Sequence, residues 1–385
     1  MEGFSIYKST IEAKGKNAVL VLEDGTVFRG FGFGASKKTS GEVVFNTGMV
    51  GYTEAITDPS YKGQILLQTY PLIGNYGVSS SSYESDGPKI EGYIIRELCR
   101  EPNHWTSEFS LDNWLLNTGI PGIEGVDTRM ITKKIRNLGT MLGILQVCET
   151  LNDDSITQLK EEIKDIIHPD KKKLVYSVAT DHIEKFDAGS RRGIVLVDCG
   201  VKFSIIKNIL ERRFNVFLTP PQTSASDILA MNPVAVVFSN GPGDPKMLED
   251  VIETARELTE TQIPMLGICL GCQILALSLG ANTYKLKFGH RGQNHPCIDL
   301  TTGRCYITSQ NHGFTVSQDS LKKQNLQLRL INANDKTVEG FECKKRLIQG
   351  FQFHPEASPG PNDTNFLFDA FFGRIASSYL GDNYA

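Results

Sequence analysis

The chain has 385 residues, of which 40% are hydrophobic and 22% are charged. This length suggests two or three domains, each large enough to bury a core without disulfide bonds. The formal net charge of -4 gives no sign of general affinity for nucleic acid or acidic membranes. The sequence has no run of eighteen apolar residues and no apolar signal-peptide core near its start. Because the eight cysteines are scattered, we expect a cytoplasmic protein with reduced thiols.

The first part of the chain, residues 1–150, predicts a mixed β/α domain. Alternating apolar residues on both sides of a turn at 23–26 indicate a β-hairpin. The segments 41–47 and 63–70 are further strand candidates, and the apolar spacing in 126–139 predicts a helix. We therefore expect one domain that ends near residue 150.

Residues 151–190 are expected to connect two domains. Apolar residues recur at helical intervals at the start of this segment, and a run of lysines follows in HPDKKK. Such a run is most simply explained as the solvated surface of a linker.

From Gly193 onward, short apolar strands alternate with amphipathic helices. The predicted strands are GIVLVD, NVFLT, VAVVFSN and IPMLGI, each followed by a segment with helical spacing. This alternation predicts parallel β–α units in a doubly wound sheet. After residue 280 the pattern becomes hairpin-like, and a helix is expected at the end of the chain. The predicted fold class is α/β, with a doubly wound, mostly parallel sheet in residues 191–385 and a mixed β/α domain before it.

The segment LGICLGCQ, residues 266–273, joins a predicted strand to a predicted helix. Its G-x-C-x-G core has the form of a nucleophile elbow, in which glycines make room for a sharp turn. The turn exposes the Cys269 thiol at the carboxyl edge of the sheet, where ligands of such folds bind. It also places the thiol at a helix N-terminus, which favours a thiolate.

The spacing of Cys269 and Cys272 has other interpretations. A redox pair requires two sulfurs that can meet, but the proline or aromatic neighbours of thioredoxin-type sites are missing. A zinc site requires a second pair of ligands, and the sequence has no second CxxC and no HxxxH. An inert buried pair is the remaining alternative. We favour a single nucleophile, Cys269, and expect no metal site.

A cysteine nucleophile requires a base, and His354 lies at the end of a predicted strand with Glu356 two residues later. On an extended segment, residues i and i+2 face the same side, so the carboxylate can hold the imidazole from behind. It would then fix the tautomer and stabilise the imidazolium. A strand-terminal histidine is often only a polar end-cap. His312 is the rival base, which we interpret as a pocket wall.

The segment SNGPGDP, residues 239–245, follows another predicted strand and contains Gly241 and Gly243. An ordinary turn between strand and helix explains this segment equally well. Because it is expected at the same edge of the sheet, its free amides could serve as an oxyanion hole beside the amide of Leu270.

The elbow, the glycine-rich turn and the late H-P-E segment together resemble the class I glutamine amidotransferases over residues 190–378. Residues 41–78 and the segment EGVDTRMITKKIRNLGTM resemble the small-subunit family of carbamoyl phosphate synthetases, as do KFGHRGQNHP, TSQNHGF and HPEASPGP. The resemblance implies thiolate attack on the side-chain amide of glutamine, release of ammonia and hydrolysis of a glutamyl thioester. It also implies a large subunit that receives the ammonia through an internal tunnel. That subunit would use ATP, Mg and bicarbonate to make carbamoyl phosphate for arginine or pyrimidine biosynthesis.

The resemblance assigns roles to the matching residues. Cys269 is the implied nucleophile, His354 its base and Glu356 the carboxylate that orients the base. The backbone amides of Gly241 and Leu270 are the implied oxyanion donors. The implied glutamine contacts are Ser60, Gly241, Gly243, Leu270, Gln273, Asn311, Gly313 and Phe314. No cofactor and no metal is implied in this chain, and its partners are L-glutamine and the large subunit rather than nucleic acid or a membrane.

Three positions are open to more than one interpretation. Ser60 is either a glutamine contact or an ordinary turn serine in D-P-S-Y. Many members of this family carry histidine where this chain has Cys272, which lies outside the implied triad. We hypothesise that Cys272 forms a disulfide with Cys269 under oxidation. Lys202 is either a pocket residue or an exposed lysine at the start of a helix.

Two other functions compete with this one. A non-catalytic scaffold that only holds the large subunit is disfavoured, because all three triad residues are present. A glutaminase of another synthase, such as one for anthranilate or GMP, leaves residues 1–150 unexplained. The sequence contains no P-loop motif, so any ATP chemistry is expected in the partner.

Overall fold

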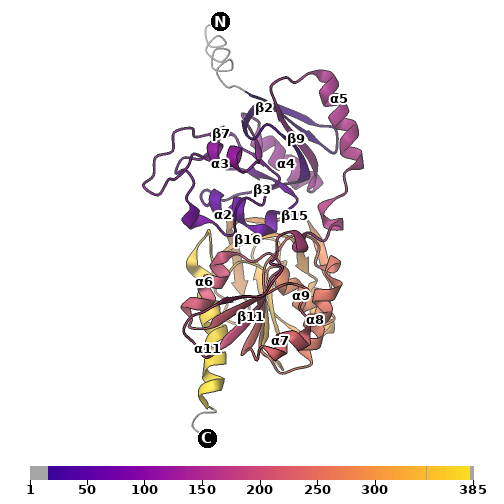
Figure 1. Ribbon diagram of the computed structural model, residues 1–385. Coiled ribbons are helices and arrows are strands. Elements are labelled where there is room, and N and C mark those ends of the chain that lie inside the picture. Colours follow the sequence, from indigo (N-terminus) through magenta and orange to yellow (C-terminus); the bar gives the residue numbers. More distant parts are fainter. Residues whose placement is uncertain (1–15, 344, 382–385) are drawn as a thin grey trace. The chain divides into compact units, whose positions relative to one another are not determined.

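The computed structural model describes residues 16–343 and 345–381 (Figure 1), and the chain divides into two compact units, Met1–Pro169 and Asp170–Ala385. Each unit has its own sheet and its own core. The predicted connector, residues 151–190, is divided between the two units. Within the described ranges, no helix has both the length and the apolar character required to cross a bilayer.

The first unit is built around a closed barrel with the strand order β1-β2-β8-β6-β4-β3-β9. The barrel strands are β1 (Lys16–Leu22), β2 (Val27–Gly34), β3 (Lys38–Asn46), β4 (Gln64–Gln68), β6 (Gly92–Ile94), β8 (Pro121–Glu124) and β9 (Met141–Cys148). The predicted hairpin pairs β1 with β2 in antiparallel register, with Leu20 opposite Phe28. At its turn, the backbone N–H of Thr26 donates to the Asp24 carboxylate. The apolar residues of β1 are fully buried and contribute to the core of this unit.

Helices pack around the barrel. They are α2 (Tyr52–Thr57), α3 (Leu111–Asn117), α4 (Thr128–Leu138) and α5 (Asp153–Glu162), and a small separate sheet pairs β5 (Leu72–Ile73) with β7 (Glu97–Leu98). The helix α4 is the one predicted in 126–139, and its N-cap Asp127 accepts from the backbone N–H of Met130. The helix α5 buries Ile156 and Leu159 against Val19 of the barrel. The helical half of the predicted connector therefore belongs to the core of the first unit.

The second unit contains a sheet with the strand order β10-β12-β11-β13-β14-β19-β18-β17-β15-β16. Its strands are β10 (Glu184–Phe186), β11 (Gly193–Val197), β12 (Asn215–Thr219), β13 (Ala235–Phe238), β14 (Met265–Ile268), β15 (Thr283–Asp299), β16 (Cys305–Val316), β17 (Gln327–Asn332), β18 (Val338–Cys343) and β19 (Ile348–Phe351). The central strands β12, β11, β13, β14 and β19 are parallel, as predicted. Antiparallel strands extend the sheet on both sides.

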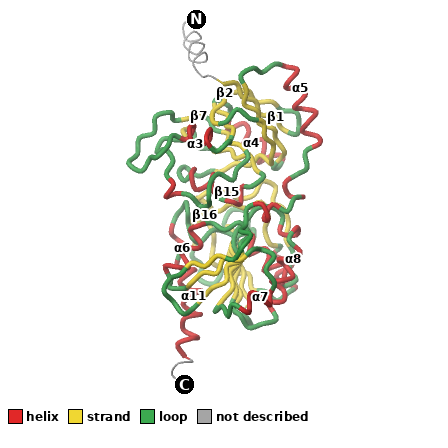
Figure 2. Tube along the Cα trace, viewed as in Figure 1, coloured by secondary structure: helices red, strands yellow, loops and turns green. Residues whose placement is uncertain are grey.

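Helices cover both faces of this sheet, which confirms the doubly wound fold class (Figures 1 and 2). They are α6 (Phe203–Glu211), α7 (Ala225–Ala230), α8 (Glu249–Thr259), α9 (Leu270–Ser278), α10 (Gln318–Lys323) and α11 (Phe366–Gly381). Neighbouring residues of β11 enter different cores, because Val195 packs with residues of α7, α8 and α9 whereas Ile194 packs with residues of α6 and α11. The parallel strands all end at one edge of the sheet, and the loops after them carry the site.

Candidate active site

Cys269 lies on the turn between β14 and α9, where the sequence predicts a nucleophile elbow. Its backbone has a φ of 53° and a ψ of -104°, and positive φ in a non-glycine residue costs about 1–3 kcal/mol. A Cβ on Gly271 would lie 2.0 Å from the Phe238 carbonyl oxygen, and one on Gly267 would lie 2.4 Å from the Gly271 carbonyl oxygen. Only glycines fit around this turn, which places the thiol at the carboxyl end of β14 and beside the first turn of α9.

The Cys269 side chain is buried, with 2% of its surface exposed. Its Sγ donates to the Asn311 carbonyl oxygen at 3.5 Å, and the side-chain nitrogen of Gln352 lies 3.9 Å from the sulfur. The thiol therefore has polar neighbours from β16 and from the segment that follows β19.

His354 and Glu356 follow β19 and form a buried ion pair, in which Nδ1 of His354 lies 2.6 Å from Oε1 of Glu356. The same carboxylate oxygen accepts from Nζ of Lys202 at 2.8 Å, and all three side chains are almost completely buried. Since Nδ1 of His354 is occupied, Nε2 is the nitrogen left for proton transfer. This buried Nε2 has no hydrogen-bond partner within the described part of the chain.

The charges of this group determine its protonation. Burial and the Lys202 cation oppose a charged ring at His354, but the Glu356 carboxylate and the Cys269 thiol together outweigh them and raise the pKa of His354 to about 10. Burial also opposes ionisation of Glu356, but Lys202 and His354 lower the pKa of Glu356 to about 2. Near neutral pH, His354 is therefore an imidazolium that is paired with the Glu356 carboxylate.

Gly241 and Leu270, the predicted oxyanion donors, are brought together at this edge of the sheet. A Cβ on Gly241 would lie 2.8 Å from Cδ2 of Leu270 and 1.9 Å from the Cys199 carbonyl oxygen. Leu270 is the first residue of α9, where backbone N–H groups have no partner inside the helix. The loop after β13 thus lies against the start of α9, and the role of the two backbone amides as oxyanion donors stays a prediction.

Several predicted glutamine contacts form one wall beside Cys269. The Nε2 of Gln273 donates to the Phe314 carbonyl oxygen at 2.8 Å and to Oε1 of Gln352 at 3.1 Å. Asn311, whose carbonyl oxygen accepts from Cys269, lies on the same strand as Gly313 and Phe314. The wall is therefore made by β16 and α9 and is held by side-chain amides.

Two other predicted contacts, Gly243 and Ser60, lie outside β16 and α9. Gly243, with a φ of 91°, lies in the loop after β13. Ser60 belongs to the first unit, where it is buried and its backbone N–H donates to Asp58 at 2.9 Å. A role of Ser60 in glutamine binding stays a prediction.

Two polar side chains extend the predicted site. Lys202 is 2% exposed and bound to Glu356, so its interpretation as an exposed lysine is wrong. Its position in the sequence, soon after an apolar strand of the sheet, is the signal that could have identified it. Gln352 is missing from the predicted site, although it stands two residues before His354, at the spacing that Glu356 has on the other side.

His312, the rival base, has both ring nitrogens next to protein oxygens. Its Nδ1 lies 2.8 Å from the Phe314 carbonyl oxygen, and its Nε2 lies 3.1 Å from Oε1 of Gln310. These contacts fit the interpretation of His312 as a support of the pocket wall.

Cys272 is fully buried in the core on one face of the sheet, whereas Cys269 packs with the core on the other face. Burial raises the pKa of the Cys272 thiol well above its ordinary value, which keeps the sulfur protonated and unreactive. The structure therefore favours a packing role for Cys272 over a disulfide with Cys269.

Two family models match the chain. Residues 20–145 match the CPSase domain of the carbamoyl-phosphate synthase small chain, and residues 195–373 match glutamine amidotransferase class-I. A carbamoyl phosphate synthase small chain from Archaeoglobus fulgidus is 49% identical over 360 residues, which covers 93% of this chain and 98% of the relative. Another from Listeria monocytogenes serotype 4b is 45% identical over 370 residues, which covers 95% of this chain and 99% of the relative.

Among solved structures, a glutamine amidotransferase from Thermotoga maritima is similar to part of the chain. It is 17% identical, matches 49% of this chain and 85% of its own length, and has a TM-score of 0.36. The family models and the two relatives confirm the predicted family over nearly the whole length. The chain belongs to the carbamoyl phosphate synthase small-chain family and is a glutamine amidotransferase subunit of that synthase.

Proposed function

We propose that the chain hydrolyses L-glutamine at Cys269 and passes the ammonia to the cytoplasmic large subunit. The large subunit uses ATP and Mg to make carbamoyl phosphate for arginine and pyrimidine biosynthesis, and this chain needs no cofactor for its own step. The proposal is supported by Nε2 of His354, which is buried without a partner within the described residues, in a ring held by Glu356 and influenced by Cys269. A ring nitrogen left free of protein partners is available to the leaving group of a substrate.

In the first step, the Cys269 thiolate attacks the side-chain carbonyl carbon of glutamine. A C–S bond forms, and the carbonyl oxygen becomes an oxyanion that accepts from the backbone amides of Gly241 and Leu270. His354 gives its Nε2 proton to the amide nitrogen, so the C–N bond breaks and ammonia leaves. Cys269 is then a glutamyl thioester.

In the second step, the neutral His354 ring takes a proton from water, and the water oxygen attacks the thioester carbon. The second oxyanion collapses, the C–S bond breaks, and glutamate leaves while the thiolate and the imidazolium are restored. Throughout, Glu356 fixes the ring through its contact with Nδ1, and Lys202 keeps the carboxylate ionised.

The test is carbamoyl phosphate synthesis by the chain purified together with its large subunit. Cys269→Ser is expected to lower the glutamine-dependent rate at least ~10³-fold. Synthesis from added ammonia is expected to continue, because it bypasses the glutaminase reaction.

The matched control is Cys272→Ala, which removes the other sulfur of the CxxC segment. It is expected to keep the glutamine-dependent rate within about threefold, because its effect is limited to packing. Equal loss in both variants would contradict the assignment of Cys269. A native complex that makes carbamoyl phosphate only from ammonia would leave the chain with a scaffold role.

A further inference from the structure

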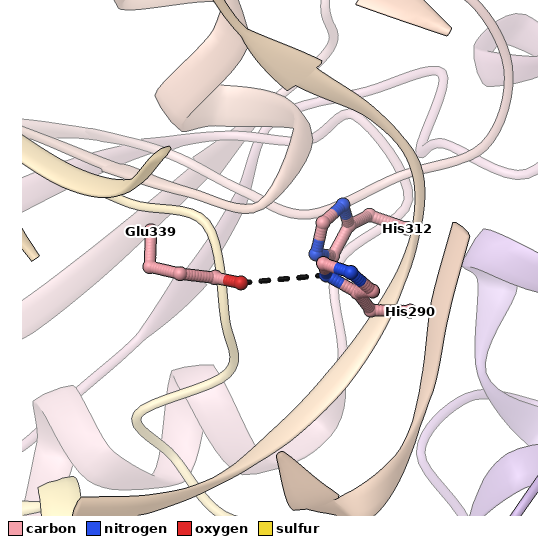
Figure 3. A group of neighbouring side chains, drawn as sticks. All are labelled: His290, His312 and Glu339. Carbon is pink, nitrogen blue, oxygen red and sulfur yellow. Dashed lines mark ion pairs between the residues drawn. The ribbon is translucent and has the colours of Figure 1, made fainter. Parts of the chain in front are cut away.

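A second group of ionisable side chains lies in the second unit, apart from the triad. It consists of His290 on β15, His312 on β16 and Glu339 on β18, with exposures of 5%, 4% and 0% (Figure 3). His290 and His312 are direct cross-strand partners, and Glu339 points toward their rings. One ligand atom from each side chain lies within 4.8 Å of the others. Two imidazoles and a carboxylate are a donor set that binds divalent transition metals.

The distance within this group is unusual for a buried histidine–carboxylate pair. Nδ1 of His290 lies 3.4 Å from Oε1 of Glu339, whereas His354 and Glu356 approach to 2.6 Å and the other nitrogen of His290 approaches Asp335 to 2.8 Å. The nitrogen–oxygen distance between His290 and Glu339 is therefore longer than in the other two buried or partly buried histidine–carboxylate pairs. Two ligand atoms of one tetrahedral Zn²⁺, each about 2.0–2.1 Å from the ion, would be about 3.3 Å apart.

The group also contains polar atoms whose hydrogen-bonding capacity is not used. Among the described residues, Nδ1 of His290 and Oε2 of Glu339 are buried without a hydrogen-bond partner, which is costly in a protein interior. His312 has two acceptors and too few protons, because both of its ring nitrogens face oxygens, those of Phe314 and Gln310. A neutral imidazole has one N–H to donate, so one of these nitrogens directs a lone pair at an oxygen. A cation at that nitrogen removes the conflict.

Around bound metals, the protein usually forms a hydrogen bond to the part of each ligand that faces away from the ion. The three side chains of this group have such contacts. Nε2 of His290 lies 2.8 Å from Asp335, and Nδ1 of His312 lies 2.8 Å from the Phe314 carbonyl oxygen. Oε1 of Glu339 accepts from Asn332 at 3.0 Å. Each histidine is therefore oriented from behind, with its other nitrogen left for an ion. Oε1 of Glu339 can bind the ion with its second lone pair while it accepts from Asn332.

We infer that His290, His312 and Glu339 bind a divalent transition-metal ion, and that Zn²⁺ suits this donor set. This inference departs from the sequence-based expectation that the chain has no metal site. Gln310 offers a fourth ligand, because its Oε1 faces His312 while its Nε2 donates to Thr308. The ion would join β15, β16 and β18 directly behind the wall formed by Asn311 and Phe314. Its role is to hold this wall in place, and it takes no part in the reaction at Cys269.

The test is the metal content of the full chain, produced without an affinity tag that binds metals. After Zn²⁺ loading and dialysis, inductively coupled plasma mass spectrometry is expected to find about one Zn²⁺ per chain. Glu339→Gln and His290→Gln are each expected to weaken binding at least ~10-fold. The matched control is His295→Gln, which removes a neighbouring ring 5.2 Å from that of His290 but outside the group. This control is expected to keep the ion, as is Cys269→Ser, which excludes binding by the thiol.

A second measurement needs no variant. Zn²⁺ is expected to raise the melting temperature of the chain stripped of metal, and Co²⁺ in its place is expected to give the visible absorption of a four-coordinate site with nitrogen and oxygen ligands. A loaded native chain with less than about 0.1 Zn²⁺, or a Glu339→Gln chain that binds Zn²⁺ like the native one, would overturn the proposal. In either case His290 is a protonated ring between two carboxylates.

Discussion

Two buried histidine–glutamate pairs lie in the second unit, and they differ in the charges around them. His354 and Glu356 are 2.6 Å apart, and Lys202 adds a second cation to the pair. His290 and Glu339 are 3.4 Å apart, and Asp335 adds a second carboxylate. The first group therefore has two cations and one carboxylate next to a sulfur, whereas the second has two carboxylates facing His290 and the Arg291 cation near His312. The same two residue types favour an anion in one place and a cation in the other.

The largest expected effect is on kcat, when one carboxylate of each histidine–glutamate pair is replaced by an amide. Glu356→Gln is expected to lower the glutaminase kcat by about 10³–10⁴-fold, because the ring of His354 loses the group that fixes its tautomer. The same variant is expected to keep its Zn²⁺. Glu339→Gln is expected to lose Zn²⁺ and to lower kcat by no more than about tenfold, since it acts only through the wall. Both quantities are measured on the same preparations, and a reversed pattern would break the comparison.

The next effect concerns the oxyanion amides, which are expected only beside the first pair. Gly241→Ala would place a Cβ 1.9 Å from the Cys199 carbonyl oxygen, so the loop must move and its amide with it. The expected result is a kcat lower by about 10²–10³-fold with little change in KM. Gly87→Ala is the control, because its Cβ meets no atom within 4 Å. A change confined to KM would assign Gly241 to glutamine binding alone.

A smaller effect is expected when the extra cation of the first pair is removed. Lys202→Met leaves the buried Glu356 with His354 as its remaining charged partner, and kcat is expected to fall by about 10–100-fold. The pH profile of kcat is expected to shift, because the carboxylate is then easier to protonate. Lys202→Arg is expected to recover part of the activity. An unchanged pH profile with lower thermal stability would show that Lys202 only supports the fold.

The smallest effect is on stability as a function of pH. The raised pKa of His354 means that its pairing stabilises the fold fully below the ordinary histidine pKa of about 6.5, and that this part is lost as the pH rises through about 10. The lowered pKa of Glu356 has the opposite sense, so its part is present above about 4.5 and is lost as the pH falls through about 2. The difference in free energy of unfolding between the native chain and Glu356→Gln is expected to be largest between pH 4.5 and 6.5. Denaturant titrations across the pH range measure it, and a flat difference would contradict the charged pair.

The parts of the site that the sequence predicts are those built from neighbouring residues. The elbow around Cys269 is visible because its two glycines lie within two positions of it, and His354 and Glu356 are separated by a single residue. The doubly wound centre of the sheet is predictable for the same reason, since each β–α unit has its own local pattern. The spacing of neighbouring residues therefore predicts both the fold class and the proposed nucleophile.

The parts that the sequence does not predict depend on contacts between distant residues. Lys202 and Glu356 are 154 positions apart, and only the sheet brings them together. The insertion of β19 between β14 and β18 is not visible in any local pattern. The group of His290, His312 and Glu339 depends on that same strand order and on cross-strand register, which a spacing rule such as HxxxH does not test. Long-range pairing is therefore the information that a single sequence lacks.

The left-handed backbone at Cys269 also has a consequence for the descent of this family. The side chain at this position carries backbone strain that glycine would avoid, and its packing in the core and its role in catalysis offset that strain. In a lineage that stops hydrolysing glutamine, selection no longer maintains the cysteine. Position 269 is then expected to drift toward glycine earlier than buried neighbours such as Leu266, whose side chain continues to fill the core. A glycine at position 269 would therefore indicate that the lineage has lost glutamine hydrolysis.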